Sequence, residues 1–238
     1  MINEAFINSN GSSSKGISAI EYLLYSGETT QETLTSFIST DNADRRTNYL
    51  FALIENLVIK SQELKEQWEA YAPTFYSTLE TGLNGSQNQL INAMITLSEQ
   101  LVILKLGNAL GDQNGGNIDI TELENYRSQV SLESIEQNVR TLYSTYTGEY
   151  RNDNDSIGFD DFLSLLNANI IDEAIRTSFE ENLTSINNIQ GSLVNALETN
   201  PQQVIELQSS LNELEVLIKV DMANALGVIV TVNSNDGD

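Results

Sequence analysis

Ser18 and Glu21 are the residues whose types and spacing come closest to a chemical site in this sequence. They fall in residues 15–26, KGISAIEYLLYS, where a helix-favouring stretch follows a Ser/Gly-rich lead-in. Positions three apart share one face of a helix, so we expect the hydroxyl and the carboxylate to lie side by side. Such a pair offers carboxylate chemistry or the binding of a hard cation. The alternative is a short core helix in which Glu21 faces solvent or caps a neighbour. Its buried stripe would be Ala19, Ile20, Leu23 and Leu24.

The sequence contains neither histidine nor cysteine. Catalytic zinc is typically held by three histidines, or by two histidines and a carboxylate, so a site of that kind is excluded. A Ser-His-Asp or Cys-His nucleophile is excluded as well. Disulfides and thiolate metal ligands are also absent. What remains open is carboxylate chemistry and the binding of hard cations.

The chain is strongly acidic, with 34 acidic and 11 basic side chains and a net charge of −23. Its basic residues are scattered, and only Arg45 and Arg46 are adjacent. Nucleic-acid binding requires a basic footprint on the phosphates, so this class of function is excluded. Arg45 and Arg46 stand near the start of a predicted long helix and could pair with Glu21 or recognise an anionic group. The alternative is a surface salt bridge, which contributes less than about 1 kcal/mol.

Two polar segments, residues 112–123 and 153–158, superficially resemble calcium-binding loops. An EF-hand needs oxygen donors at positions 1, 3 and 5, glycine at 6 and glutamate at 12. The first segment is one residue short and has Gly116 where the third donor should stand, and the second fails at its fifth position. The sequence therefore favours a glycine-rich turn in which Thr121 caps a helix.

Three blocks of the sequence resemble the imelysin-like family, which is also described as an insulin-cleaving metallopeptidase or iron-regulated protein family. Residues 15–26 resemble its signature helix, which normally reads Gly-x-His-x-x-Glu followed by Tyr-Leu-Leu. Gly16 and Glu21 match this motif, but Ser18 replaces the histidine. Residues 124–132, ENYRSQVSL, are similar to an internal block of the family. Residues 219–238, beginning KVDM and ending NDGD, resemble its characteristic ending. The chain is identified as a member, with about the first quarter of a typical member missing before Met1.

The resemblance implies a site and a cellular setting. It places a pocket around Gly16, Ser18 and Glu21, with Glu21 as a metal ligand and with Asp236 and Asp238 of the ending packed nearby. It implies a divalent metal or iron as cofactor. It also implies a role in iron uptake at the periplasm or outer cell envelope, and a precursor carrying an export signal or lipid anchor. Because Ser18 offers only a weak neutral hydroxyl in place of imidazole, we do not expect the peptidase activity for which the family was named.

The sequence predicts an all-α protein of two helical-bundle halves, residues 1–110 and 120–238, with a short extended C-terminal tail. Apolar residues recur at three and four positions in most segments, and the glycine- and asparagine-rich residues 107–119 are the expected linker. Pro73 should break or kink a long helix that ends near Trp68. The order of elements after residues 16 and 158 suggests a duplication. No apolar run reaches the ~18 residues of a membrane span.

Three functions fit these observations. The first is a non-catalytic binding protein of an iron-acquisition system, with iron-uptake components or a small ligand as partners. The second is a metal-dependent peptidase of the imelysin type. The third is a structural or protein-interaction module that presents an acidic surface.

Overall fold

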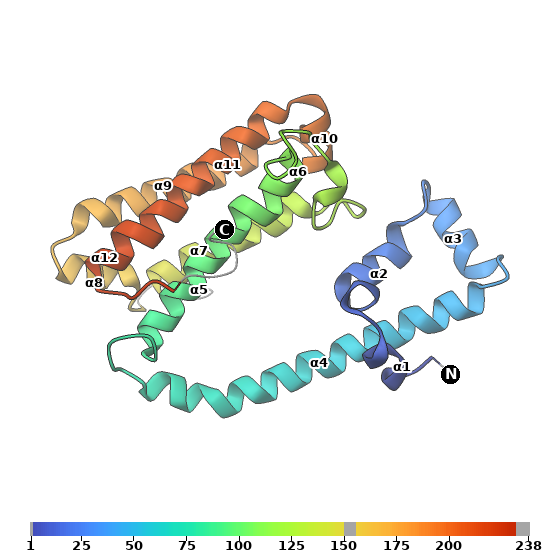
Figure 1. The fold of residues 1–238 in the computed structure, drawn as a ribbon, viewed down its shortest axis with the longest axis horizontal. Helices are drawn as coiled ribbons and strands as arrows, with labels where there is room; N and C mark the ends of the chain where they lie inside the picture. Colours follow the sequence, from blue (N-terminus) through green and yellow to red (C-terminus); the bar gives the residue numbers. More distant parts are fainter. Residues whose placement is uncertain (1, 150–155, 232–238) are drawn as a thin grey trace. The chain divides into compact units, whose positions relative to one another are not determined.

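The computed structural model describes residues 2–149 and 156–231, and the chain forms two compact units, residues 1–75 and 76–238. Within the described residues every regular element is helical, so the all-α prediction is confirmed. Figure 1 shows the N-terminal unit in blue and the C-terminal unit in green to red.

The N-terminal unit consists of short helices packed against the first half of one long helix. Its elements are α1 (Glu4–Ser9), the 3-10 turn η1 (Ser12–Ser14), α2 (Gly16–Tyr25), α3 (Thr30–Ile38) and α4 (Ala43–Ser77). Its small core joins α1, α2 and α4 through Ile7, Ala19, Leu23, Ala52 and Leu53.

Local hydrogen bonds explain where these helices begin, but proline does not end α4. Thr29 Oγ1 accepts from the backbone N–H of Glu32 at 3.2 Å, and the Glu32 carboxylate accepts from the N–H of Glu28 at 2.9 Å. The spacing of Thr29 and Glu32 in the sequence is that of a capping box, and the structure forms it. The predicted end of the long helix near Trp68 is wrong, since α4 continues through Pro73 to Ser77. Proline removes only one backbone donor, and helical bonding continues on either side of it.

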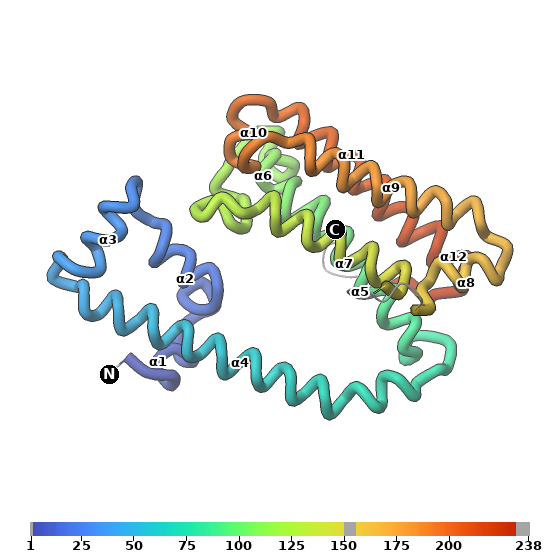
Figure 2. The backbone as a smooth tube through the Cα atoms, turned by 180° about the vertical axis from the view of Figure 1, so that it is seen from behind, coloured from blue at the N-terminus to red at the C-terminus, as the bar shows by residue number. Residues whose placement is uncertain are grey.

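The C-terminal unit is a four-helix bundle (Figures 1 and 2), whose long helices run alternately up and down. Two of its rods are composite, because an α-helix passes into a π-helical segment and then back into α-helix. The elements are α5 (Ser86–Gln100), η2 (π, Leu101–Gly107), α6 (Asn108–Leu110), η3 (3-10, Ile120–Glu122), α7 (Ser131–Thr147), α8 (Phe159–Leu165), α9 (Asn169–Asn188), α10 (Leu193–Thr199), α11 (Pro201–Val216), η4 (π, Leu217–Met222) and α12 (Ala223–Ala225).

The bundle core follows the helical period of the apolar residues closely. The last long helix buries its apolar stripe throughout: Val204, Leu207, Leu211, Leu214 and Ile218. This helix begins at Pro201, directly after Asn200. The helical period also continues from α9 into α10, yet the structure divides this stretch into two helices. Gly191 takes a φ of +78°, and Ser192 then accepts from the N–H of Asn195 at 3.2 Å, so that α10 begins as a separate helix.

The compact units divide the chain at a different place from the predicted halves. The rod from α5 to α6 contributes Ile91, Met94, Leu101 and Leu106 to the same core as α7, α9 and α11. It therefore belongs with residues beyond 120. The boundary between the compact units falls after residue 75 in the sequence. The reason is that the glycine-rich residues 107–119 connect two helices of one bundle instead of two separate bodies. The suggested duplication stays a prediction.

Part of the predicted C-terminal tail packs along α5. Val228 and Val230 are partly buried against the bundle core, whereas Ile229 and Thr231 alternate with them and are exposed. Alternation of this kind is typical of an extended segment. The tail as predicted also included residues 232–238, which lie outside the described residues.

The rod Ser86–Leu110 is long and apolar enough to cross a membrane by length and composition alone. Half of its most apolar window is buried inside the structure, as in the core helix of a bundle. We therefore describe it as a bundle helix, and the absence of a membrane span stays a prediction.

Candidate functional site

Gly16 begins the motif helix α2 with a φ of +76°. Glycine enters this left-handed region without the steric cost that a Cβ brings. Beyond its chain neighbours, no atom lies within 4 Å of the place that a Cβ would take. Backbone conformation, and not shortage of space, therefore favours glycine at this position of the motif.

Ser18 and Glu21 have different environments on α2. Ser18 is exposed, whereas Glu21 is buried, with only 7% of its surface accessible. Glu21 therefore does not face solvent, which removes one of the alternatives considered above. The predicted apolar stripe is only partly correct, because Ala19 and Leu23 are buried but Leu24 is 40% exposed. Charged side chains are rarely buried to this extent unless they are paired, so the burial of Glu21 is unusual for a carboxylate.

A cavity of about 560 Å³ that is wide open to solvent lies in the N-terminal unit beside α2. Its wall combines apolar, hydroxyl, amide and guanidinium groups from α1, α2, α3 and α4. The lining residues are Ile2, Phe6, Asn10, Ser14, Leu23, Ser36, Thr40, Asn42, Arg45, Arg46 and Tyr49. Of the predicted site residues, Arg45 and Arg46 line this cavity, whereas Gly16, Ser18 and Glu21 are not among its lining residues.

Arg46 joins the start of α4 to the end of α2. Its Nη2 donates to the backbone carbonyl of Leu23 at 2.6 Å and to Ser26 Oγ at 3.1 Å. Carbonyls in the last turn of a helix lack helical partners and attract cations. The guanidinium also lies 5.0 Å from the ring centre of Phe37, within the range of a cation–π contact. Arg46 Nε is buried and has no hydrogen-bond acceptor among the described residues.

Tyr49 holds another wall of the cavity in place. Its hydroxyl donates to the backbone carbonyl of Ser14, two residues before the motif glycine, and accepts from Asn10 Nδ2 at 3.2 Å. Its ring meets Phe6 edge-on, with the ring centres 6.2 Å apart. The side of the cavity nearest the motif is therefore organised by contacts within the N-terminal unit.

Metal-binding geometry is not present in the part of the chain that the structure describes. No group of three or more Asp or Glu side chains there could hold a metal ion. Asp236 and Asp238 lie outside the described residues, as do residues 153–155 of the calcium-like segment 153–158. In the other calcium-like segment Asp119, and not Thr121, provides the helix cap. Asp119 Oδ1 accepts from the N–H and the hydroxyl of Thr121 at 2.9 and 2.7 Å, and these bonds lower the pKa of its carboxyl.

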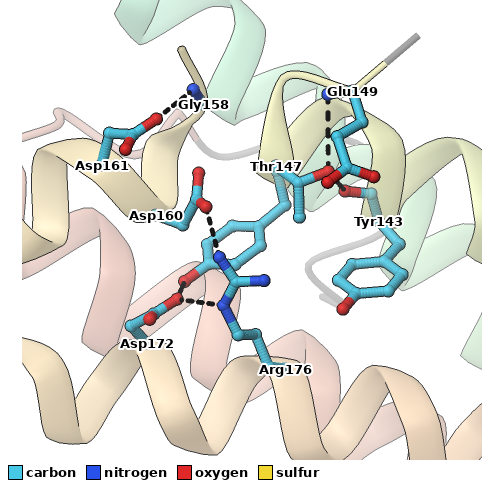
Figure 3. A network of polar contacts seen from close by, with 9 residues as sticks. Tyr143, Thr147, Glu149, Gly158, Asp160, Asp161, Asp172 and Arg176 are labelled. Carbon is cyan, nitrogen blue, oxygen red and sulfur yellow. Dashed lines mark hydrogen bonds and ion pairs between the residues drawn. The ribbon is translucent and has the colours of Figure 1, made fainter. Parts of the chain in front are cut away.

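A polar network in the C-terminal unit was not predicted from the sequence (Figure 3). Arg176 on α9 contacts Asp160 on α8, and its Nε donates to Asp172 Oδ1 at 3.0 Å. The hydroxyl of Tyr146, a fully buried residue on α7, donates to the same Asp172 oxygen at 2.6 Å. Burial, and then the hydrogen bond to Asp172, raise the pKa of Tyr146 and keep its hydroxyl protonated. The network therefore ties three helices together.

Lysine–carboxylate pairs accompany both π-helical segments. Lys219 on η4 bonds Glu99, which is 2% exposed, with Nζ and Oε1 2.6 Å apart. Lys105 on η2 bonds Glu124 of the following loop. Segments of π-helix are uncommon and occur frequently at functional sites. Periodicity arguments miss them because a π turn holds one residue more than an α turn.

Comparison with protein families matches residues 2–220 to the family described as Imelysin. Comparison with curated proteins gives no match. The family match includes the motif helix, the cavity and nearly all of the bundle, whereas the resemblance of residues 221–238 lies beyond it. A match of this extent establishes the assignment: the chain belongs to the imelysin family.

Proposed function

We propose that this protein is a non-catalytic, ligand-binding member of the imelysin family that acts in iron acquisition at the cell envelope. The observation that carries the proposal is the cavity of about 560 Å³ beside the motif helix. Its size falls in the range of small-molecule sites. Arg46 connects the cavity to α2 through the carbonyl of Leu23. A ligand that contacts Arg46 in the cavity would therefore be connected to α2, the helix that carries Glu21.

The choice of binding over catalysis rests on the motif itself. Hydrolysis of a peptide requires a group that activates water, and metallopeptidases commonly use a metal held by imidazole. Ser18 stands where the family has its histidine, and the chain has no histidine elsewhere. A neutral hydroxyl is a weak ligand, so the motif supports recognition better than it supports hydrolysis.

The resemblance to the family is the source of four parts of this proposal: iron as the ligand, a location at the cell envelope, a lipid anchor and iron-uptake proteins as partners. Glu21 is the residue proposed to contribute a metal contact. Its place in the family motif and its burial support this assignment.

The test is calorimetric titration and thermal unfolding of metal-free protein with Fe(III), Fe(II), haem, Ca²⁺ and Zn²⁺. We expect at least one iron form to bind and raise the melting temperature, because a ligand at 100 times its Kd stabilises the folded state by about 2.7 kcal/mol. Glu21→Gln should weaken binding of a bare metal ion. Glu55→Gln, which removes an exposed carboxylate from the same unit, is the matched control.

Two outcomes would overturn the proposal. One is hydrolysis of an unfolded protein substrate that a chelator abolishes, because this would make the protein a peptidase. The other is the absence of any response to all iron forms, because this would leave no iron-related binding function. In that case an interaction module recovered with partners from envelope extract would become the better explanation.

A further inference from the structure

We propose that the cavity beside α2 is an anion-binding site, which takes a small organic molecule bearing a carboxylate or phosphate on an apolar body. This inference deepens the proposed function and rests on it in using the same cavity. It changes the class of ligand, from a bare cation held by Glu21 to an oxyanion held by Arg45 and Arg46.

Arg45 and Arg46 differ in their ion pairing from most other basic side chains of the chain. Elsewhere in the described residues, six cations of this acidic chain pair with carboxylates, among them Arg140 with Glu136 and Arg176 with Asp160. Arg45 and Arg46 form no such ion pair within the described residues, although Asp41 and Asp44 are close to them in sequence. Two guanidinium groups without carboxylate partners line one cavity. Guanidinium is the group that proteins use most to recognise carboxylate and phosphate in a bidentate manner.

Arg46 has one hydrogen-bond donor, Nε, without an acceptor among the described residues. Nη2 is occupied by Leu23 and Ser26, which fixes the guanidinium in place. Nε is buried and has no acceptor among the described residues, and an unsatisfied buried donor lowers the stability of the folded state. Because Nε is closed to solvent, an oxyanion beside the guanidinium would supply its acceptor after a shift of the side chain. Satisfying this donor would then add to the stabilisation that the anion gives.

Both arginines lie in the first turn of α4, a helix of 35 residues. The N-terminal end of a helix carries a partial positive charge, so cations there are unfavourable and anions favourable. Arg45 and Arg46 add two positive charges to this end, and Asp44 of the same turn adds one negative charge. A bound anion would relieve their mutual repulsion and complement the helix end at the same time.

The other residues that line the cavity indicate the chemistry of the part of the ligand that does not contact the arginines. Ile2, Phe6 and Leu23 offer an apolar surface, and Tyr49 is fixed by its bonds to Asn10 and Ser14. Hydroxyl and amide groups surround the arginines: Ser36, Thr40 and Asn42. An inorganic anion would leave the apolar wall uncovered. The arrangement fits an amphiphilic organic anion better than a free ion.

The test is calorimetric titration of the full chain with three probes: octanoate, citrate and inorganic phosphate. We expect octanoate to bind most tightly, because it alone among the probes combines an anionic head with an apolar tail. Arg45→Gln should weaken binding at least tenfold. Arg45 is exposed and makes no described side-chain bond, so this variant should fold normally. Lys65→Gln removes the same charge from α4 away from the cavity and should change affinity less than twofold.

Ionic strength and a second variant complete the design. Raising salt from about 0.02 to 0.3 M should weaken binding, since it screens the attraction between exposed charges. Arg46→Gln should abolish binding, but it also removes the contact with Leu23, so only a variant that retains its helical circular dichroism is interpreted. Tight binding of phosphate alone would reassign the site to a phosphate group and contradict the apolar part of the inference.

Two results separate this inference from the proposed function. If an iron form binds wild type and Arg45→Gln equally and no probe binds, the anion site is wrong while the proposed function stands. If octanoate binds through Arg45 and no iron form binds, the anion site stands while the iron-related function is wrong.

Discussion

The side-chain amide of Asn88 bonds both backbone groups of Ile229. Asn88 Oδ1 accepts from the N–H of Ile229 at 2.8 Å, and Asn88 Nδ2 donates to its carbonyl at 3.0 Å. One turn further along α5, Asn92 Oδ1 accepts from the N–H of Thr231 at 2.8 Å. Two asparagines on one face of a helix thus take the place of a neighbouring strand, and they hold residues 229–231 against the bundle.

Replacing Asn88 with alanine should destabilise the C-terminal unit by about 1–3 kcal/mol, because the N–H of Ile229 loses its acceptor and its carbonyl keeps only the bond from Asn92 Nδ2 at 2.9 Å. Asn88 is itself only 5% exposed, so water does not readily take its place. Urea unfolding followed by circular dichroism measures the change. Asn224→Ala, at an exposed position of α12, is the matched control and should have little effect. Equal stability of the two variants would show that the tail contributes nothing.

Asp172→Ala should cost more stability than Tyr146→Phe. Removing Asp172 leaves the buried Tyr146 hydroxyl and one donor of Arg176 without their acceptor, a loss of about 1–3 kcal/mol. Tyr146→Phe removes the hydroxyl and leaves Asp172 bonded to Arg176, so we expect about 0.5–1.5 kcal/mol. A double-mutant cycle by urea unfolding should give a coupling energy above about 0.5 kcal/mol. Additive effects would contradict the contact.

Asp160 should make the stability of the bundle fall as pH rises through the acidic range. Burial raises the pKa of its carboxyl above the usual 3.8, against the opposing effect of Arg176. Since the folded state binds its proton more tightly than the unfolded state does, Asp160 favours folding at low pH, and this advantage is lost between 3.8 and the raised pKa. Asp160→Asn should therefore gain stability relative to wild type from pH 3.5 to 7, as measured by urea unfolding. Parallel pH profiles for the two proteins would contradict this prediction.

Gly16→Ala should destabilise the N-terminal unit by about 1 kcal/mol, because an L-residue is strained at a φ of +76°. Gly16→Asn should cost less, since asparagine tolerates this region better than alanine. Thermal unfolding of both variants provides the measurement. If alanine were as stable as glycine, the backbone explanation for the motif glycine would be wrong.

Local patterns in the sequence predicted the local parts of the structure. The period of Val204, Leu207 and Leu211 indicated a buried seam, and Thr29 indicated a helix start, because both signals depend on neighbours within one or two turns. The failure at Pro73 is of a different kind. It reflects a long helix that tolerates one missing hydrogen bond, which propensity alone does not reveal.

The candidate site was predicted only in part, because its members are distant in sequence. The motif drew attention to Glu21 and the charge pattern to Arg45 and Arg46, but nothing in the spacing indicated that Ile2, Thr40 and the arginines share one cavity. The contacts of Tyr146 with Asp172 and of Asn88 with Ile229 span 26 and 141 residues. Such pairs depend on how helices pack, which a single sequence does not specify.

The π-helical segments Leu101–Gly107 and Leu217–Met222 have a consequence for how the length of this bundle can change. A π turn accommodates one residue more than an α turn. Deleting one residue inside either segment can therefore be absorbed locally, as the segment tightens into α-helix and the flanking faces keep their orientation. The same deletion in the middle of α7 would rotate everything beyond it by about 100°. Single-residue insertions and deletions among related sequences should accordingly collect at these two places.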